Sequence, residues 1–168
     1  MGNKTSIPVL SYNNNEKQFN MHSYRQLLYH IVLVTYKRQN VLTEEHHDQL
    51  FNYIHGIVKN KNSVLYRING ISDHIHLLCD IHPTIALSDF INIVKTSSNK
   101  WMKASGLFPE FESWATGYGA FTKSTSDKNM IINYIRNQKE HHKKTTFEKE
   151  YKRLLDEEGI DWDERYFL

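Results

Sequence analysis

The chain has little of what would place it in several common classes. Cysteine occurs only once, as Cys79, so no disulfide can form within the 168 residues, and a reducing compartment is favoured. No apolar run approaches the roughly 18 residues of a membrane-spanning helix. No basic segment followed by an apolar one marks a secretory signal. We therefore expect a cytoplasmic protein without a membrane partner.

The chain also lacks a strong excess of charge of one sign. Its net charge is +2 with ten histidines taken as neutral, and 39% of the residues are hydrophobic, as in a soluble globular domain. The charges are nevertheless unevenly placed, because lysines cluster in two regions and acidic residues collect near the end. The two lysine clusters are Lys95, Lys100 and Lys103, and Lys139, Lys143 and Lys144. They are compatible with a polyanionic ligand and equally with solvated helix faces.

The order of the predicted elements indicates the fold class. Residues 1–20 are polar and rich in asparagine, and we interpret them as a flexible leader. The pattern then predicts strands over 27–34, 64–71, 73–81 and 114–122. It predicts helices after Thr43, from Thr84 or Ser88 to Gly106, from Ser126–Asp127 to about His142, and from Thr145 to Leu155, the last with Thr145 and Glu148 as a capping box. The first six elements predict an α+β fold, a ferredoxin-like split β-α-β antiparallel sheet with helices on one face. A C-terminal helix and an extra helix follow.

The strand predicted over 114–122 contains Gly117 and Gly119. Glycines inside a strand suggest a bulge or a close backbone approach to a ligand. The neighbouring aromatic side chains, Tyr118 and Phe121, could stack on unpaired bases or belong to the core.

His74 and His76 interrupt an apolar strand at a spacing of two. Both side chains therefore leave the same face of the strand, and neutral imidazole is a common metal ligand. Cys79 lies on the opposite face by the same alternation, which makes it a poor third ligand. A site with nitrogen and oxygen donors would suit Mg²⁺ or Mn²⁺. Alternatively, the two histidines are core residues satisfied by polar neighbours.

Tyr134 and Gln138 lie four residues apart on a predicted helix, so they are neighbours on one helical face. Gln138 offers a neutral oxygen ligand, and a tyrosine beside a divalent cation can attack phosphorus. Tyr134 could instead be a core residue beside Ile131 and Ile135, with its hydroxyl at the surface.

Together these stretches resemble a known family. The chain is similar to the single-tyrosine transposases of the smallest bacterial insertion sequences, within the HUH endonuclease superfamily, and to the REP-associated tyrosine transposases. The resemblance spans about residues 24–142. The matching stretches are Tyr24-Arg25, Tyr29-His30-Ile31-Val32, Ser72-Asp73-His74-Ile75-His76-Leu77-Leu78, Pro83, Leu87-Ser88, Val94-Lys95-Thr96-Ser97-Ser98 and Tyr134-Ile135-Arg136-Asn137-Gln138.

The resemblance implies a role for each candidate residue. It implies that His74, His76 and Gln138 are the ligands of Mg²⁺ or Mn²⁺, and that Tyr134 is the nucleophile. The implied substrate is single-stranded DNA with hairpins at the ends of a mobile element, which is cut and rejoined through a 5′-phosphotyrosine link. The implied assembly is a homodimer in a bacterial cytoplasm, associated with the nucleoid when bound to DNA. Four basic residues are expected to contact DNA, namely Lys95, Lys100, Lys103 and Arg136.

Other functions of the same residues stay open at this point. The chain could be a domesticated or inactive relative that binds or nicks DNA hairpins, or a nicking enzyme of the replication-initiation or relaxase type. In domain terms, we expect the leader over 1–20, a catalytic domain over 21–145, and a C-terminal helix and tail over 146–168 packed on that domain.

Overall fold

A computed structural model describes residues 25–163, so the expected leader over 1–20 and the last five residues of the tail lie outside the described residues. The four strands form one antiparallel sheet in the order β2-β3-β1-β4, as predicted for a ferredoxin-like α+β fold. Their bounds are β1 Leu28–Val34, β2 Val64–Gly70, β3 His74–Asp80 and β4 Gly119–Lys123. No helix among these residues is long and apolar enough to span a membrane.

The two central strands, β1 and β3, are nearly all buried because each is covered on both faces. Their register places Val32 opposite His76 and Val34 opposite His74. Alternation then sends the side chains of Ile75, Leu77 and Cys79 to one face of the sheet, and His74 and His76 to the other. The sequence pattern predicted this division.

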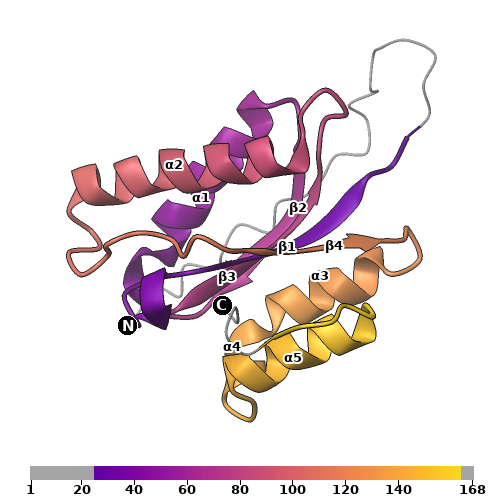
Figure 1. Ribbon diagram of the computed structural model, residues 1–168. Coiled ribbons are helices and arrows are strands. Elements are labelled where there is room, and N and C mark those ends of the chain that lie inside the picture. Colours follow the sequence, from indigo (N-terminus) through magenta and orange to yellow (C-terminus); the bar gives the residue numbers. More distant parts are fainter. Residues whose placement is uncertain (1–24, 164–168) are drawn as a thin grey trace, which may run out of the picture.

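The apolar face of the sheet is covered by two long helices, α1 (His47–Asn60) and α2 (Leu87–Ser105). Two short 3-10 helices, η1 (Tyr36–Arg38) and η2 (Glu44–His46), connect β1 to α1. Figure 1 shows both helices on the same side of the strands. Their apolar stripes, which include Leu50, Ile54, Phe90 and Val94, pack on Ile75 and Leu77 in the largest core cluster. Burial of this face fixes the strand that carries the two histidines.

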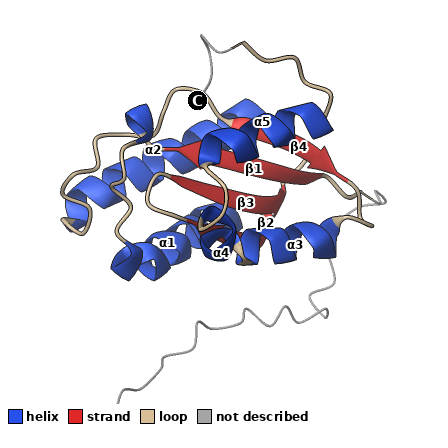
Figure 2. Ribbon diagram, turned by 90° about the horizontal axis from the view of Figure 1, so that it is seen from below, coloured by secondary structure: helices blue, strands red, loops and turns tan. Residues whose placement is uncertain are grey.

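Three shorter helices cover the opposite face, which is the histidine face. They are α3 (Lys128–Arg136), α4 (Gln138–His142) and α5 (Phe147–Glu157). Figure 1 shows them on the other side of the strands from α1 and α2, and Figure 2, seen from below, shows α5 toward β4 and α3 toward β2. Apolar side chains of α5, such as Phe147 and Leu154, pack on Val32 and Val34. Ile131 and Ile135 of α3 pack on Leu78. The histidines are therefore enclosed on a side that the sequence did not assign to any helix.

The predicted third helix is in fact two helices. The α3 helix ends at Arg136 and α4 begins at Gln138, with Asn137 between them at φ −94° and ψ 14°. The amide of Asn137 donates to the carbonyls of both Asn133 and Tyr134, which tightens the last turn of α3. Tyr134 and Gln138 thus belong to different helices, although both reach the same face of the sheet.

Two predicted helix caps are displaced. Helix α2 follows Ala86, which has no capping side chain, while the Thr84 hydroxyl contacts His82 instead. Helix α5 is capped by Thr146, not Thr145, because the extended Thr146 places its hydroxyl 3.4 Å from the amide of Lys149.

Strand β4 is shorter than predicted and begins at Gly119 instead of Trp114. Trp114 makes an isolated bridge with Thr35, so the chain leaves the sheet before it returns as β4. The expected close approach at Gly119 exists, but what approaches is the chain's own α5. A Cβ at Gly119 would lie 2.9 Å from Cε2 of Tyr151 and 3.3 Å from Cβ of Val32. Glycine is therefore needed here for packing of α5.

Candidate metal and nucleophile site

His74 and His76 stand side by side on β3, and both are fully buried. One ring nitrogen of each is held by a neighbouring side chain. Nδ1 of His74 lies 2.7 Å from Oδ1 of Asp73, and Nδ1 of His76 lies 2.9 Å from Nε2 of His30. Partners of this kind fix the orientation of the ring and leave the other nitrogen available to a ligand.

The remaining nitrogens of this pair face the space beneath α3, α4 and α5. Nε2 of His74 and Nε2 of His76 are buried without a hydrogen-bond partner among the described residues. Burial lowers the pKa of His76 to about 4 and the pKa of His30 well below its ordinary value, in both cases more than nearby charges do. The imidazoles of His30 and His76 are therefore neutral at pH 7, which is the form of histidine that binds metal ions.

Tyr134 and Gln138 reach this space from α3 and α4. The Tyr134 ring lies edge-on to the rings of His30 and His76, with centroids 5.9 Å apart in both cases. Gln138 is fully buried, and its Oε1 has no hydrogen-bond partner among the described residues. The structure thus brings together Tyr134, Gln138, His74 and His76, although they come from three different elements.

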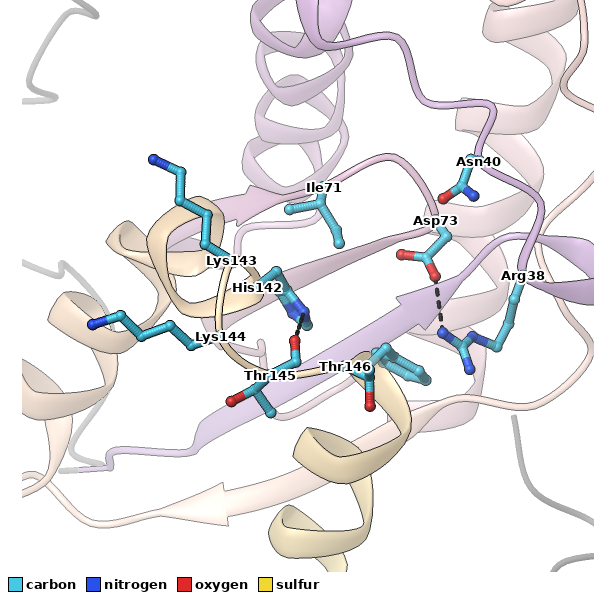
Figure 3. A pocket seen from close by; sticks show the side chains of 10 residues that line it. Arg38, Asn40, Ile71, Asp73, His142, Lys143, Lys144, Thr145 and Thr146 are labelled. Atoms are coloured by element: carbon cyan, nitrogen blue, oxygen red, sulfur yellow. Dashed lines mark hydrogen bonds and ion pairs between the residues drawn. The ribbon is translucent and has the colours of Figure 1, made fainter.

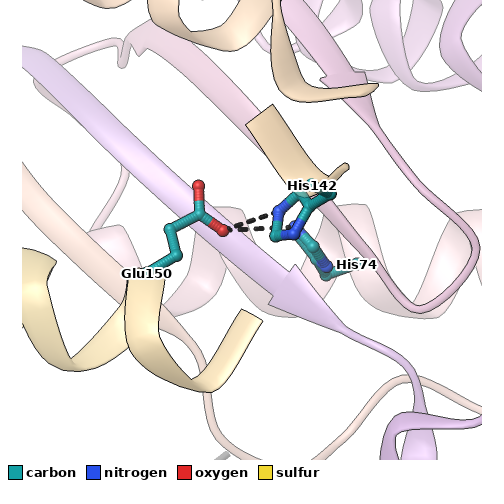
Figure 4. Close-up of side chains that lie close together, drawn as sticks. All are labelled: His74, His142 and Glu150. Atoms are coloured by element: carbon teal, nitrogen blue, oxygen red, sulfur yellow. Dashed lines mark ion pairs between the residues drawn. The ribbon is translucent and has the colours of Figure 1, made fainter. Parts of the chain in front are cut away.

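A carboxylate that the sequence analysis did not select lies at the centre of this group. Glu150 of α5 is 1% exposed, and its Oε1 accepts hydrogen bonds from the Tyr134 hydroxyl and, at 2.9 Å, from Nε2 of Gln138. Its Oε2 lies 2.8 Å from Nε2 of His142 and 3.6 Å from Nε2 of His74. Figure 4 shows this carboxylate pointing from α5 toward the two imidazoles.

A signal for Glu150 was present in the sequence. The buried residues of α5 are Phe147, Glu150, Tyr151, Leu154 and Leu155, which follow the spacing of one helical face. Glu150 is the one acidic residue on the apolar stripe of this charged helix. Because an unpaired carboxylate is almost never buried, an acidic residue at such a position indicates a partner in the site.

The charges around Glu150 explain how the carboxylate is tolerated there. Burial alone would raise the pKa of Glu150, but contacts with His142, His76 and Tyr134 outweigh it and lower the pKa. For Tyr134, burial and the adjacent carboxylate both raise the pKa of the phenol. The structure therefore holds Glu150 ionised and Tyr134 protonated at neutral pH.

A surface pocket adjoins the site beside His142 and Asp73. Figure 3 shows its lining, in which Arg38 pairs with Asp73 at 3.1 Å and Nδ1 of His142 bonds the carbonyl of Thr145 at 3.0 Å. The other lining residues are Asn40, Ile71, Lys143, Lys144, Thr146 and Phe147. The pocket is thus polar, and its basic residues outnumber its single acidic one.

The structure separates the four basic residues that we expected to contact DNA. Lys95, Lys100 and Lys103 lie on α2, which covers the face of the sheet opposite to Tyr134. The Lys95 ammonium donates to the carbonyls of residues 115, 116 and 117 at 2.6–3.0 Å, so its protons are used within the fold. Arg136 is exposed at the end of α3, on the same side as the site.

Comparison with known proteins decides the family. The family model described as "Transposase IS200 like" matches residues 23–138, which is well over half of the chain. The chain belongs to the IS200-like transposases. Within this family, it is 27% identical over 120 residues to the ISDra2 transposase TnpA of Deinococcus radiodurans, a match that covers 67% of this chain and 84% of the relative.

Solved structures share the fold of this IS200-like chain. A crystal structure of a putative transposase from Deinococcus radiodurans has a TM-score of 0.57 at 25% identity and covers 73% of this chain and 98% of its own. A REP-associated tyrosine transposase bound to a REP hairpin has a TM-score of 0.52 at 17% identity, covers 73% of this chain and 74% of its own, and shows the fold alone. The family match ends at Gln138, so α5 and Glu150 lie beyond it.

Proposed function

We propose that this chain cuts and rejoins single-stranded DNA at the ends of an insertion sequence through a covalent link to Tyr134. The observation that carries the proposal is the position of the Tyr134 hydroxyl in one buried cluster with His74, His76 and Gln138. Membership of a transposase family supplies the reaction class. The geometry supports Tyr134 as the nucleophile, because candidate metal ligands lie beside its hydroxyl.

We further propose that Mg²⁺ or Mn²⁺ is held by His74, His76 and Gln138. The donor set fits such an ion, because two imidazole nitrogens and one amide oxygen are buried there with no hydrogen-bond partner among the described residues. When bound, the cation would polarise a phosphate oxygen and stabilise the charge that develops during cleavage.

The contribution of the protein itself is to position the nucleophile. In the proposed step, a bond forms between the Tyr134 oxygen and phosphorus while the bond from phosphorus to the 3′ oxygen breaks. The phenol loses its proton and the 3′ oxygen gains one, which leaves a 5′-phosphotyrosine and a free 3′ hydroxyl. The reverse step at a new 3′ end rejoins DNA without an energy source, because the phosphotyrosine conserves the bond.

The surroundings of the site support a polyanionic substrate. The pocket beside His142 carries Arg38, Lys143 and Lys144, whose positive charges would attract the phosphates of a DNA strand. Since a neighbour of the same fold is bound to a REP hairpin, we propose hairpin-bearing single-stranded DNA as the substrate. From the family resemblance we also propose a homodimer as the working assembly.

The test is formation of a covalent adduct. The full chain is incubated with single-stranded DNA carrying the element ends, with and without Mn²⁺, and adducts are separated under denaturing conditions. The wild-type chain should form an adduct only with Mn²⁺, and Tyr134→Phe should form none. Tyr53→Phe is the matched control and should behave as wild type. Tyr53 of α1 stacks on Trp101 of α2, on the opposite side of the sheet from Tyr134. An adduct with Tyr134→Phe would refute the assignment. Joining of a second strand would separate a transposase from a nicking enzyme.

A further inference from the structure

We propose that Glu150 of α5 is an additional ligand of the divalent cation, so that α5 completes the metal site. The inference rests on the proposed function for the presence of the cation. It goes beyond it because α5 lies outside the stretch that the family shares, and because the ligands assigned above come only from β3 and α4.

The two oxygens of Glu150 are used differently. Oε1 accepts the hydrogen bonds of Tyr134 and Gln138, which fixes the plane of the carboxylate. Oε2 is buried and pairs at 2.8 Å with Nε2 of His142, whereas the nearby Nε2 atoms of His74 and His76 have no hydrogen-bond partner among the described residues. Burial of unpaired imidazole nitrogens beside a carboxylate costs free energy, which a cation shared among them would offset.

The spacing of these atoms is that of shared ligands and not of hydrogen bonds. Nε2 of His74 is 3.6 Å from Oε2, and Nε2 of His76 is 3.6 Å from Oε1, both too long for a hydrogen bond. Two ligands bound at ~2.1 Å to one ion can lie up to about 4.2 Å apart, so both distances fall within that span. Ligand atoms of His74, His142 and Glu150 all lie within 4.8 Å of one another.

The backbone around Glu150 is rigid enough to place a ligand. Phe147 is 2% exposed, stacks on Tyr151 with ring centroids 5.3 Å apart, and lies 4.5 Å from the ring of His74. Leu154 anchors the next turn of the helix against the sheet. The carboxylate is therefore held over the histidines by a packed helix face, as a ligand on a preformed element should be.

Binding of Mn²⁺ to the full chain without DNA tests this inference. Titration calorimetry compares the wild type with Glu150→Gln, which keeps the shape of the side chain and removes its charge. We expect Glu150→Gln to weaken Mn²⁺ binding by more than about tenfold, since loss of an outer-shell partner alone costs that much. Glu148→Gln is the matched control, because Glu148 is exposed on the same helix and pairs with Lys152 away from the site.

The outcomes separate this inference from the proposed function. His76→Ala should bind Mn²⁺ weakly. Binding that is weakened by His76→Ala but not by Glu150→Gln would leave the proposed function standing while refuting this inference. Equal or tighter binding by Glu150→Gln would overturn the ligand role and show that the carboxylate competes with the ion. Absence of Mn²⁺ binding in the wild type would overturn both proposals. If circular dichroism shows Glu150→Gln to be unfolded, Glu150→Asp gives the same test, because its shorter side chain keeps the charge but draws the oxygens away from the histidines.

Discussion

The contact between Gly119 and α5 gives a sharp test of the fold. An alanine at Gly119 would place its Cβ 2.9 Å from Cε2 and 3.0 Å from Oη of Tyr151, and 3.3 Å from Cβ of Val32. The Tyr151 ring can move only by disturbing its stack on Phe147, and Val32 belongs to a central strand. Insertion of a methyl group into such a packed site costs about 1–3 kcal/mol. We therefore expect Gly119→Ala to lower the free energy of unfolding by that amount.

Urea denaturation, followed by circular dichroism, measures this change. Gly56→Ala is the matched control, because Gly56 lies inside α1 with nothing within 4 Å of the added Cβ, and alanine there should raise stability by roughly 0.5–1 kcal/mol. The change from glycine to alanine should thus lower the free energy of unfolding at Gly119 and raise it at Gly56. Tyr151→Leu should relieve much of the cost at Gly119, which gives a coupling energy of at least about 0.5 kcal/mol in a double-mutant cycle. A Gly119→Ala protein as stable as the wild type, or a strictly additive double variant, would refute the packing argument.

Three further outcomes are expected. Asp73→Asn should weaken Mn²⁺ binding roughly 10–100-fold in calorimetry by releasing Nδ1 of His74, while Asp89→Asn, at an exposed position of α2, should have no effect. The Asp73 carboxyl also has a lowered pKa, because its interactions with His74 and Arg38 together outweigh burial, so its stabilisation is present above pH ~4 and lost as the pH falls further. Asp73→Asn should therefore flatten the acid side of the stability profile measured by urea denaturation. Lys95→Met should cost about 1–3 kcal/mol of stability in the same assay because it removes three hydrogen bonds from a charged donor, whereas Lys100→Met should cost less than about 0.5 kcal/mol.

The parts of the fold that follow from local periodicity could be predicted from the sequence. Alternation along 73–81 correctly separated Cys79 from His74 and His76, because a strand has a fixed period of two. The order of strands and helices gave the ferredoxin-like arrangement for a similar reason. In each case, the information lies within one element or in the order of neighbouring elements.

The parts that depend on contacts between distant elements could not be predicted. Nothing local to the last helix shows that it covers the histidine face, so the sequence analysis did not select Glu150 as a site residue. The hydrogen bonds of Lys95 could not be foreseen either, because its three carbonyl acceptors lie 20–22 residues away in an irregular segment. His30 looked like an apolar-strand residue until the pairing of β1 with β3 set it beside His76.

Alternate residues of β3 face opposite sides of the sheet. Ile75 and Leu77 contact the helices on one side, while the neighbouring His74 and His76 face the site on the other, so both sets share one backbone. A void made on the apolar side would let that backbone shift, and displacements on the order of 1 Å are enough to cost a catalytic site about a hundredfold in rate. Substitutions among residues that never meet DNA are therefore a means of detuning the reaction, and selection on the site extends to the core behind it.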